Sequence, residues 1–230
     1  MSDALNQLTK NGAMRFAINT GNRALVQRDG DALKGISPAL ADRLSAELGV
    51  QMKPIIYDGA GKVFGDADAD IWDVAFLAID PLRAEKIAYT RPYITIEATF
   101  AVRAGSAVHD VGDVDRAGHS VLTSIGSAYD LHLTKTLQHA RLDRLGTPPE
   151  SFEAYRAGAW DAVAGVRASL ERAFADDPGF RILPGVLTKV EQAMVLPRPD
   201  HPATADLDAF VKRALDDGFV AEFLEGNGSA

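Results

Sequence analysis

The sequence of 230 residues contains no cysteine. This absence excludes disulfide bonds, thiol chemistry and zinc sites built on thiolates, and it fits any cellular compartment. Long apolar runs are also missing, because no stretch approaches the roughly 20 apolar residues that a membrane-spanning helix needs. We therefore expect no direct membrane insertion.

The chain has no excess of positive charge. Its formal net charge is -8 at pH 7, and no basic stripe stands out. Nucleic acids and anionic membranes bind basic surfaces, so neither is an expected partner. With 47% hydrophobic and 24% charged residues, the composition is typical of a soluble globular protein with room for one large domain or two lobes.

Familiar catalytic and metal-binding motifs are missing too. The five histidines, at positions 109, 119, 132, 139 and 201, have no spacing that would bring two of them onto one helix turn. The chain also lacks a Gly-x-Ser-x-Gly nucleophile motif and a Gly-x-x-x-x-Gly-Lys phosphate loop. We therefore expect no metal, no cofactor and no catalytic residue of these kinds.

Short β-rich runs alternate with amphipathic helical stretches, which is typical of α/β proteins. The pattern predicts strands at residues 14–19, 51–57, 73–79, 119–125, 161–166 and 192–197. It predicts helices at residues 38–48, 128–137 and 167–175, and a final pair of helices within residues 203–224. The first helix has the clearest signals, since Ser37 can cap it, Pro38 suits its first turn and Gly49 can end it.

The two halves of the chain contain a short echo. "IWDVAFLA" near Trp72 and "AWDAVAGV" near Trp160 both place Trp-Asp just ahead of an apolar strand. The echo indicates one structural position in two similar lobes. Coincidence is the alternative, because single short matches are common.

Arg83 follows the carboxyl end of the apolar strand that begins near Ala75. In open α/β sheets ligands collect at this edge, and arginine binds a planar carboxylate through two parallel hydrogen bonds. Arg83 is therefore a candidate ligand-binding residue. The alternative is a solvated ion pair with Asp80 or Glu85, which would contribute little to stability.

Gly126 and Ser127, in "TSIGSAYDL", lie between a predicted strand and a predicted helix. Backbone amides at a helix start can bind an anion. Ser127 also suits a plain N-cap, and the two roles are compatible. An anion held by Arg83 from one lobe and by this helix start from the other would bridge a cleft between them.

These stretches resemble a known family. "AIDPLRAEKIAYTRPY" is similar to the Thr-Ile-Thr-Pro-Glu-Arg-Ala and Phe-Ser-Asp-Pro-Tyr stretch of the bacterial solute-binding proteins of the polar amino-acid ABC transport family, family 3. "LTKNGAMRFAI", "LKGISPALADRLSAELGVQMKPI" and "GAWDAVAGV" resemble further family motifs in the same order. The resemblance covers nearly the whole chain.

The resemblance implies a type II periplasmic-binding-protein fold, in which two α/β lobes are joined by two hinge strands and a ligand lies in the cleft between them. The crossings would lie near residues 98–103 and 194–196. Lobe 1 would be discontinuous, with residues 1–100 and 197–230, and lobe 2 would comprise residues 101–196.

The resemblance also implies ligand contacts. Arg83 matches the arginine that binds the ligand α-carboxylate, and Ser127 matches a second-lobe hydroxyl residue whose helix start completes that site. Asn19 and Asn22 fall in the loop after the first strand, where the family places side chains that touch the ligand.

Two departures from the family pattern leave the ligand class open. Ala78 and Asp80 stand where the family usually has hydroxyl residues. Where many members have an acidic residue for the ligand ammonium, this chain has Val166-Arg167. If Arg167 points into the cleft, it favours a dicarboxylate or another anionic ligand. If it points to solvent, it says nothing about the ligand.

Asp80 and Glu97 complicate the choice of ligand. Either could supply negative charge for an ammonium group from a new direction, or Asp80 could simply pair with Arg83. Phe76, Ala78 and Tyr129 could line the cleft against an apolar or aromatic part of the ligand, although such residues are more often core or rim.

The leading hypothesis is a monomeric solute-binding protein, not an enzyme, that captures a small carboxylate-bearing ligand for an ABC transporter permease. The alternatives are a cyclohexadienyl-dehydratase-like enzyme, with Asp80 or Glu97 as acid or base, and a cytosolic metabolite sensor. The family implies a periplasmic location if a signal peptide was removed. Since the N-terminus shows no secretory pattern, a cytoplasmic location is also open.

Overall fold

The structure, a computed structural model, describes residues 3–227. The chain forms two compact units. Unit 1 comprises the segments Met1–Thr20, Leu25–Thr95 and Glu191–Ala230, and unit 2 comprises Gly21–Ala24 and Ile96–Val190. The units divide after residues 95 and 190, against the expected 100 and 196. The ends of the expected lobe 1, residues 1–2 and 228–230, lie outside the described residues.

Unit 1 is built on a sheet in which the strand order is β4-β1-β5-β11. Strand β1 is parallel to both β4 and β5, and β11 runs antiparallel to β5. The strands are β1 (Ala13–Asn19), β4 (Gln51–Tyr57), β5 (Val74–Ala78) and the later part of β11 (Thr188–Pro197), with a separate hairpin of β2 (Gln27–Asp29) and β3 (Ala32–Lys34).

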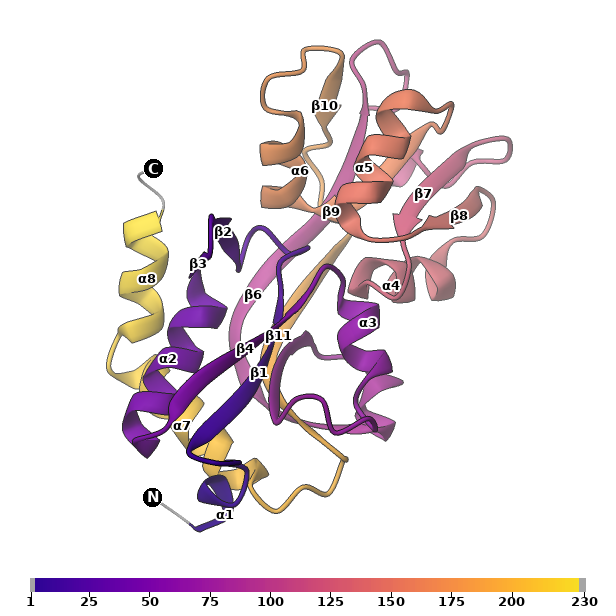
Figure 1. The fold of residues 1–230 in the computed structure, drawn as a ribbon. Helices are drawn as coiled ribbons and strands as arrows, with labels where there is room; N and C mark the ends of the chain where they lie inside the picture. Colours follow the sequence, from indigo (N-terminus) through magenta and orange to yellow (C-terminus); the bar gives the residue numbers. More distant parts are fainter. Residues whose placement is uncertain (1–2, 228–230) are drawn as a thin grey trace. The chain divides into compact units, whose positions relative to one another are not determined.

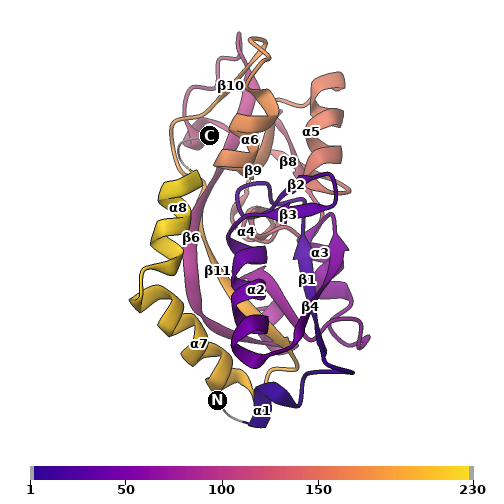
Figure 2. The ribbon, with the colours of Figure 1, turned by 60° about the vertical axis from the view of Figure 1, so that its left-hand side comes forward.

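Helices cover both faces of this sheet. Figure 1 shows α2 (Ile36–Leu48) and α3 (Ala60–Gly65) on opposite sides of β1 and β4. Because side chains alternate along a strand, Ala17 faces the α3 side, where it packs with Val63 and Trp72, and its neighbours face the α2 side. The remaining helices are α1 (Asp3–Asn6), the 3₁₀ turn Arg83–Glu85, α7 (Thr204–Asp216) and α8 (Phe219–Asn227). Helix α7 contacts α1, and α8 contacts α2 (Figure 2).

The start of α2 differs from the prediction. Gly35 is the N-cap, and Ser37 lies inside the first turn with its hydroxyl hydrogen-bonded to the hydroxyl of Tyr93. The expected Ser37 cap is therefore wrong. Gly35 has a φ of 119°, and a Cβ there would lie 2.1 Å from the carbonyl oxygen of Leu25, so only glycine fits. The predicted end is confirmed, because Gly49 closes the helix in a left-handed conformation.

Unit 2 repeats the α/β arrangement, with strand order β6-β9-β7-β8 and β10 paired with β6. Its core joins residues of β7, β9, α5 and α6, including Leu122, Phe152, Val163 and Leu170. The elements are the later part of β6 (Ile87–Arg103), the 3₁₀ turn Val111–Asp113, β7 (Ser120–Ser124), α4 (Ala128–Thr136), β8 (Arg141–Leu145), α5 (Pro148–Ala157), β9 (Ala162–Val166), α6 (Arg167–Phe174), β10 (Phe180–Ile182) and the first part of β11.

The Trp-Asp echo marks equivalent positions in the two units. In unit 1, the backbone amide of Asp73 donates to the carbonyl of Arg15, and its carboxylate accepts the Arg15 amide at 2.8 Å. In unit 2, the backbone amide of Asp161 donates to the carbonyl of Ser120, and its carboxylate accepts the Ser120 amide at 2.7 Å. Each aspartate thus ties its own strand to the start of the neighbouring parallel strand. The structure confirms that the echo is not coincidence.

Strands β6 and β11 each have residues in both units. The expected α/β fold class is confirmed. No helix among the described residues is both long enough and apolar enough to cross a membrane.

Candidate functional site

Arg83 sits in a tight turn directly after β5. All five residues of β5 are buried. The carboxylate of Asp80 accepts the backbone amides of Leu82 at 2.8 Å and of Arg83 at 3.3 Å. Asp80 therefore holds the turn that presents Arg83 at the carboxyl end of the parallel strand.

The Arg83 side chain is buried, with only 2% of the residue exposed. This burial excludes a solvated surface ion pair. Its Nη1 donates to the carbonyl oxygen of Ala78 at 3.1 Å, and the Tyr89 hydroxyl donates to the same oxygen at 3.0 Å. Burial lowers the pKa of Arg83, opposed by the nearby Tyr89 and Asp80. A guanidinium stays charged even so, and Arg83 therefore places a positive charge at the edge of the sheet.

Phe76 belongs to the core of unit 1. It is 5% exposed, and its ring meets the ring of Tyr93 edge-on with centroids 6.0 Å apart. Thus unit 1 brings Arg83, Asp80 and Ala78 together, while Phe76 packs inside β5.

In unit 2, Ser127 caps helix α4. Its hydroxyl accepts the backbone amide of Asp130 at 3.1 Å. The Asp130 carboxylate in turn accepts the Gly126 amide at 2.9 Å and pairs with Arg144 at 2.8 Å. Gly126 has a φ of 67°, which suits glycine at this turn. The Gly126 amide is therefore engaged within unit 2.

The next two amides belong to the first turn of α4. Among the described residues, the backbone amides of Ala128 and Tyr129 have no hydrogen-bond acceptor. Both lie in the first turn, where amide dipoles favour an anion. The Tyr129 hydroxyl is bonded to Ser124, and burial raises the pKa of Tyr129 to about 12. The sequence pointed to this helix start but not to these two amides, since spacing alone does not show which ones Asp130 satisfies.

The Arg167 side chain is bound by acceptors of the protein itself. Its Nε donates to the Glu97 carboxylate at 3.2 Å. Its terminal nitrogens donate to the carbonyl oxygens of Leu183, Pro184 and Gly185 at 2.8–3.2 Å. Every described hydrogen bond of this cation is therefore made within unit 2, to a carboxylate and three carbonyls.

The two candidate asparagines, Asn19 and Asn22, lie at and just after the end of β1. Asn19 is the last residue of β1. The Oδ1 atom of Asn22 is buried and has no hydrogen-bond partner in the described chain. An orphaned buried acceptor is costly unless a donor reaches it, which makes Asn22 a candidate ligand contact.

Tyr89 is a residue that sequence reasoning missed. It lies in β6 and shares the Ala78 carbonyl with Arg83, and burial raises its pKa to about 12. No local pattern signals this role, because the contact joins residues 11 positions apart. Among the described residues, no group of three or more His, Asp or Glu side chains is placed to hold a metal ion.

Solved structures of about 20% identity or less share this fold. The arginine-bound form of truncated ArgBP from T. maritima has a TM-score of 0.78 at 20% identity, covering 92% of this chain and 99% of that one. The solute receptor for L-cysteine of Neisseria gonorrhoeae has a TM-score of 0.86 at 17% identity, covering 97% and 92%. The ancestral amino acid-binding protein AncCDT-1, a precursor of cyclohexadienyl dehydratase, has a TM-score of 0.81 at 18% identity, covering 96% and 98%.

Sequence comparison agrees with the fold. No curated protein sequence matches the chain. The family model of the bacterial extracellular solute-binding proteins, family 3, matches residues 14–226. The match spans both units and includes the turn that carries Arg83 and the helix start at Ser127. The chain therefore belongs to the bacterial extracellular solute-binding proteins, family 3.

Proposed function

We propose that this protein captures an amino acid or a related small organic acid and that the ligand carboxylate binds Arg83. The observation that carries the proposal is a buried guanidinium at the carboxyl end of β5. Ligands of α/β sheets collect at that edge. A bidentate contact with a carboxylate would offset the cost of burying the cation.

The helix start of unit 2 supports a second anchor for the same carboxylate. The amides of Ala128 and Tyr129 have no acceptor in the described chain, and Ser127 caps the helix beside them. Carboxylates are stabilised by such amides because the N-terminal end of a helix carries partial positive charge.

Glu97 and Asn22 support a ligand that also carries an ammonium group. One Glu97 oxygen pairs with Arg167, whereas the other has no hydrogen bond in the described chain, and 42% of the side chain is exposed. The Asn22 Oδ1 atom likewise has no donor. Arg167 already binds protein acceptors, which argues against a dicarboxylate held by Arg167. The Glu97 oxygen and Asn22 Oδ1 therefore favour an amino acid as the ligand.

The similar structures support the same ligand class. They include an arginine-bound protein and a receptor for L-cysteine. Together with family membership, they support a role in which the protein works outside the cytoplasm and delivers its ligand to an ABC transporter permease.

Binding is favoured over catalysis because the protein already donates hydrogen bonds to both candidate acid–base groups. Asp80 accepts two backbone amides, and Glu97 pairs with Arg167. Both carboxylates therefore already have protein donors. A catalytic acid or base would instead have to exchange its proton with the bound ligand.

A thermal-shift screen tests the proposed function. Amino acids, opines, dicarboxylates and cyclic carboxylates would be compared with the matching carboxamides, which lack the carboxylate. We expect at least one carboxylate to raise the melting temperature, because a ligand at a hundred times its Kd stabilises the fold by about 2.7 kcal/mol. Its carboxamide should give no shift. The proposal fails if the carboxamide stabilises as well as the acid, or if no acid in the panel stabilises the protein.

A further inference from the structure

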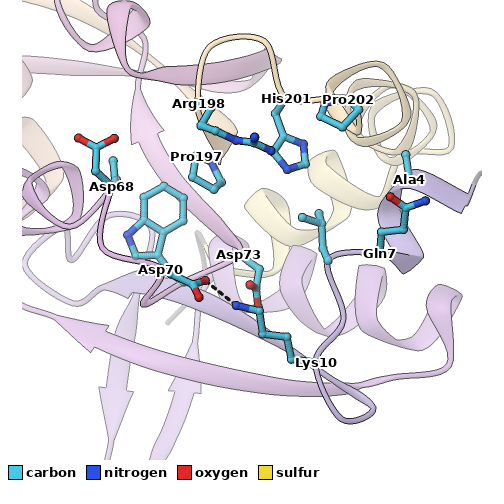
Figure 3. A pocket seen from close by; sticks show the side chains of 13 residues that line it. Ala4, Gln7, Lys10, Asp68, Asp70, Asp73, Pro197, Arg198, His201 and Pro202 are labelled. Atoms are coloured by element: carbon cyan, nitrogen blue, oxygen red, sulfur yellow. Dashed lines mark hydrogen bonds and ion pairs between the residues drawn. The ribbon is translucent and has the colours of Figure 1, made fainter.

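A surface hollow lies in unit 1 at the end of the sheet opposite Arg83. It has a volume of about 460 Å³. Its walls are the segment after α1, the loop that precedes β5, and the loop that follows β11 (Figure 3). The volume is in the range of small-molecule sites.

The carboxylates of the hollow already have cations. Asp70 and Asp73 both pair with Arg15 at 2.7 Å. Asp68 pairs with Lys86 at 3.1 Å. Asp70 also pairs with Lys10, as the dashed line in Figure 3 shows. The acidic side of the hollow is therefore internally neutralised.

Arg198 is different. It lines the hollow and is exposed, yet its guanidinium has no ion pair or hydrogen bond with any described residue. Figure 3 shows its side chain extended across the hollow beside the ring of His201. Among the described residues, no carboxylate forms an ion pair with this cation of the hollow.

The backbone around the hollow is unusual. The three described non-glycine residues with positive φ are Asn11, Asp70 and Arg198. Asp70 and Arg198 line the hollow, and Asn11 follows Lys10, which lines it too. Left-handed backbone is unfavourable for a side chain like that of Arg198, whose φ is 75°. Such strain concentrates at functional sites.

His201 supplies a second donor. Its Nδ1 accepts the backbone amide of Ala203 at 3.1 Å, so the neutral ring carries its proton on Nε2. Burial and the charge of Arg198 lower the pKa of His201, opposed by Asp200. The ring is 8% exposed and forms part of the wall.

We propose that this hollow is a second ligand site, which binds a small organic carboxylate with an apolar body. Arg198 would grip the carboxylate through two parallel hydrogen bonds, with the His201 Nε2–H as a further donor. Leu8, Pro197 and Pro202 line the hollow and would contact the apolar body. The apolar contacts distinguish such a ligand from inorganic phosphate or acetate.

This site is separate from the proposed amino-acid site. Strand β5 lies between them, with Trp72 and Asp73 before its first residue and Arg83 after its last. The Arg198 backbone amide donates to the carbonyl of Lys86, three residues after Arg83, but the Arg83 guanidinium lies at the last residue of β5 and the hollow lies before its first. A substitution of either side chain should therefore leave binding at the other site unchanged.

Nuclear magnetic resonance with benzoate as the probe tests the proposal. The chain has two tryptophans, and only Trp72 lines the hollow, whereas the Trp160 indole donates to Asp143 in unit 2. We expect benzoate to shift the Trp72 indole resonance and not that of Trp160, with a Kd of about 1 mM or tighter. Acetate and inorganic phosphate should bind at least tenfold more weakly.

Three variants locate the interaction. Arg198→Gln should weaken benzoate binding at least tenfold. Arg28→Gln, which changes an exposed arginine of the hairpin in unit 1, should not change it. Arg83→Met should also leave it unchanged, which separates this site from the amino-acid site. The proposal is overturned if benzoate leaves Trp72 unshifted, if Arg198→Gln binds like the unsubstituted protein, if phosphate or acetate binds as well as benzoate, or if Arg83→Met removes the interaction.

Discussion

Arg167 stands at the start of α6 and joins three parts of unit 2. It binds Glu97 in β6 and the carbonyls of the loop that leads into β11. Thr99 donates to two of the same carbonyls, on Leu183 and Gly185. A cation near the positive end of a helix is mildly unfavourable, and these acceptors explain why it is retained.

Replacing Arg167 tests this structural role. Arg167→Met keeps the length of the side chain and removes every donor, so Glu97 and three carbonyls lose a partner. Because 24% of the Arg167 side chain is exposed, water can replace part of the loss. We expect a decrease of about 1–3 kcal/mol in the free energy of unfolding, measured by urea denaturation.

The control for this substitution is Arg172→Met on the same helix. Arg172 is exposed and makes no described hydrogen bond or ion pair, so its loss should change stability by less than about 0.5 kcal/mol. Equal stability of the two variants would show that the contacts of Arg167 do not matter.

At the residue scale, the sequence located the candidate binding groups better than their partners. Arg83 and Ser127 are identifiable because each directly follows a strand, where function concentrates in α/β sheets. The partners of Arg167 were not predictable, since the loop around Leu183 lies 16 residues away and has no pattern of its own. The structure gives Arg167 a structural role within unit 2, and its role toward a ligand stays a prediction.

At the scale of elements, the Trp-Asp pairs show how each unit starts its sheet. Asp73 is 4% exposed and also receives two hydrogen bonds from the Arg15 side chain. Asp161 is less buried and receives the amide and hydroxyl of Ser120. The same position is therefore held by an ion pair in unit 1 and by neutral donors in unit 2.

Asparagine substitutions should separate the two positions. Asp73→Asn removes a largely buried ion pair and should destabilise unit 1 by about 2 kcal/mol. Asp161→Asn keeps an acceptor for Ser120 and should cost about 0.5–1 kcal/mol. Amide hydrogen exchange should show lost protection in β1 for the first variant and in β7 for the second.

Asp68→Asn is the matched control, since Asp68 lies in the same loop and makes only an exposed pair with Lys86. It should leave exchange in both strands unchanged. Equal loss of protection in β1 and β7 for both main variants would contradict the assignment of each aspartate to its own unit.

Elements with a regular apolar pattern were predictable, and polar ones were not. Strands β4, β5 and β9 lie where the sequence placed them, because apolar residues mark them. Strand β8, "RLDRL", was missed because it is an edge strand with largely exposed, charged residues. The Ser37 cap was mistaken because Ser-Pro is a common start signal, whereas the close approach to Leu25 that demands Gly35 is a tertiary contact.

For the whole molecule, the alternation of strands and helices and the ordered motifs predicted the fold class and the family. The ligand was not predictable. Val166-Arg167 stands where many family members have an acidic residue for the ligand ammonium, and the acceptors that could take over that role come from separate segments. The central proposal for the whole molecule is that Arg83 binds the ligand carboxylate.

Calorimetric titration of the ligand found in the thermal-shift screen tests that claim most directly. Arg83→Met removes the charge at similar length, and circular dichroism shows whether the variant is folded. We expect its affinity to fall about tenfold to a hundredfold, because a charge-assisted bidentate contact is worth about 1.5–3 kcal/mol. Arg91→Met, which removes an exposed pair with Asp208 in the same unit, should leave the affinity unchanged. A folded Arg83→Met variant that binds the ligand as tightly as the unsubstituted protein would contradict the account.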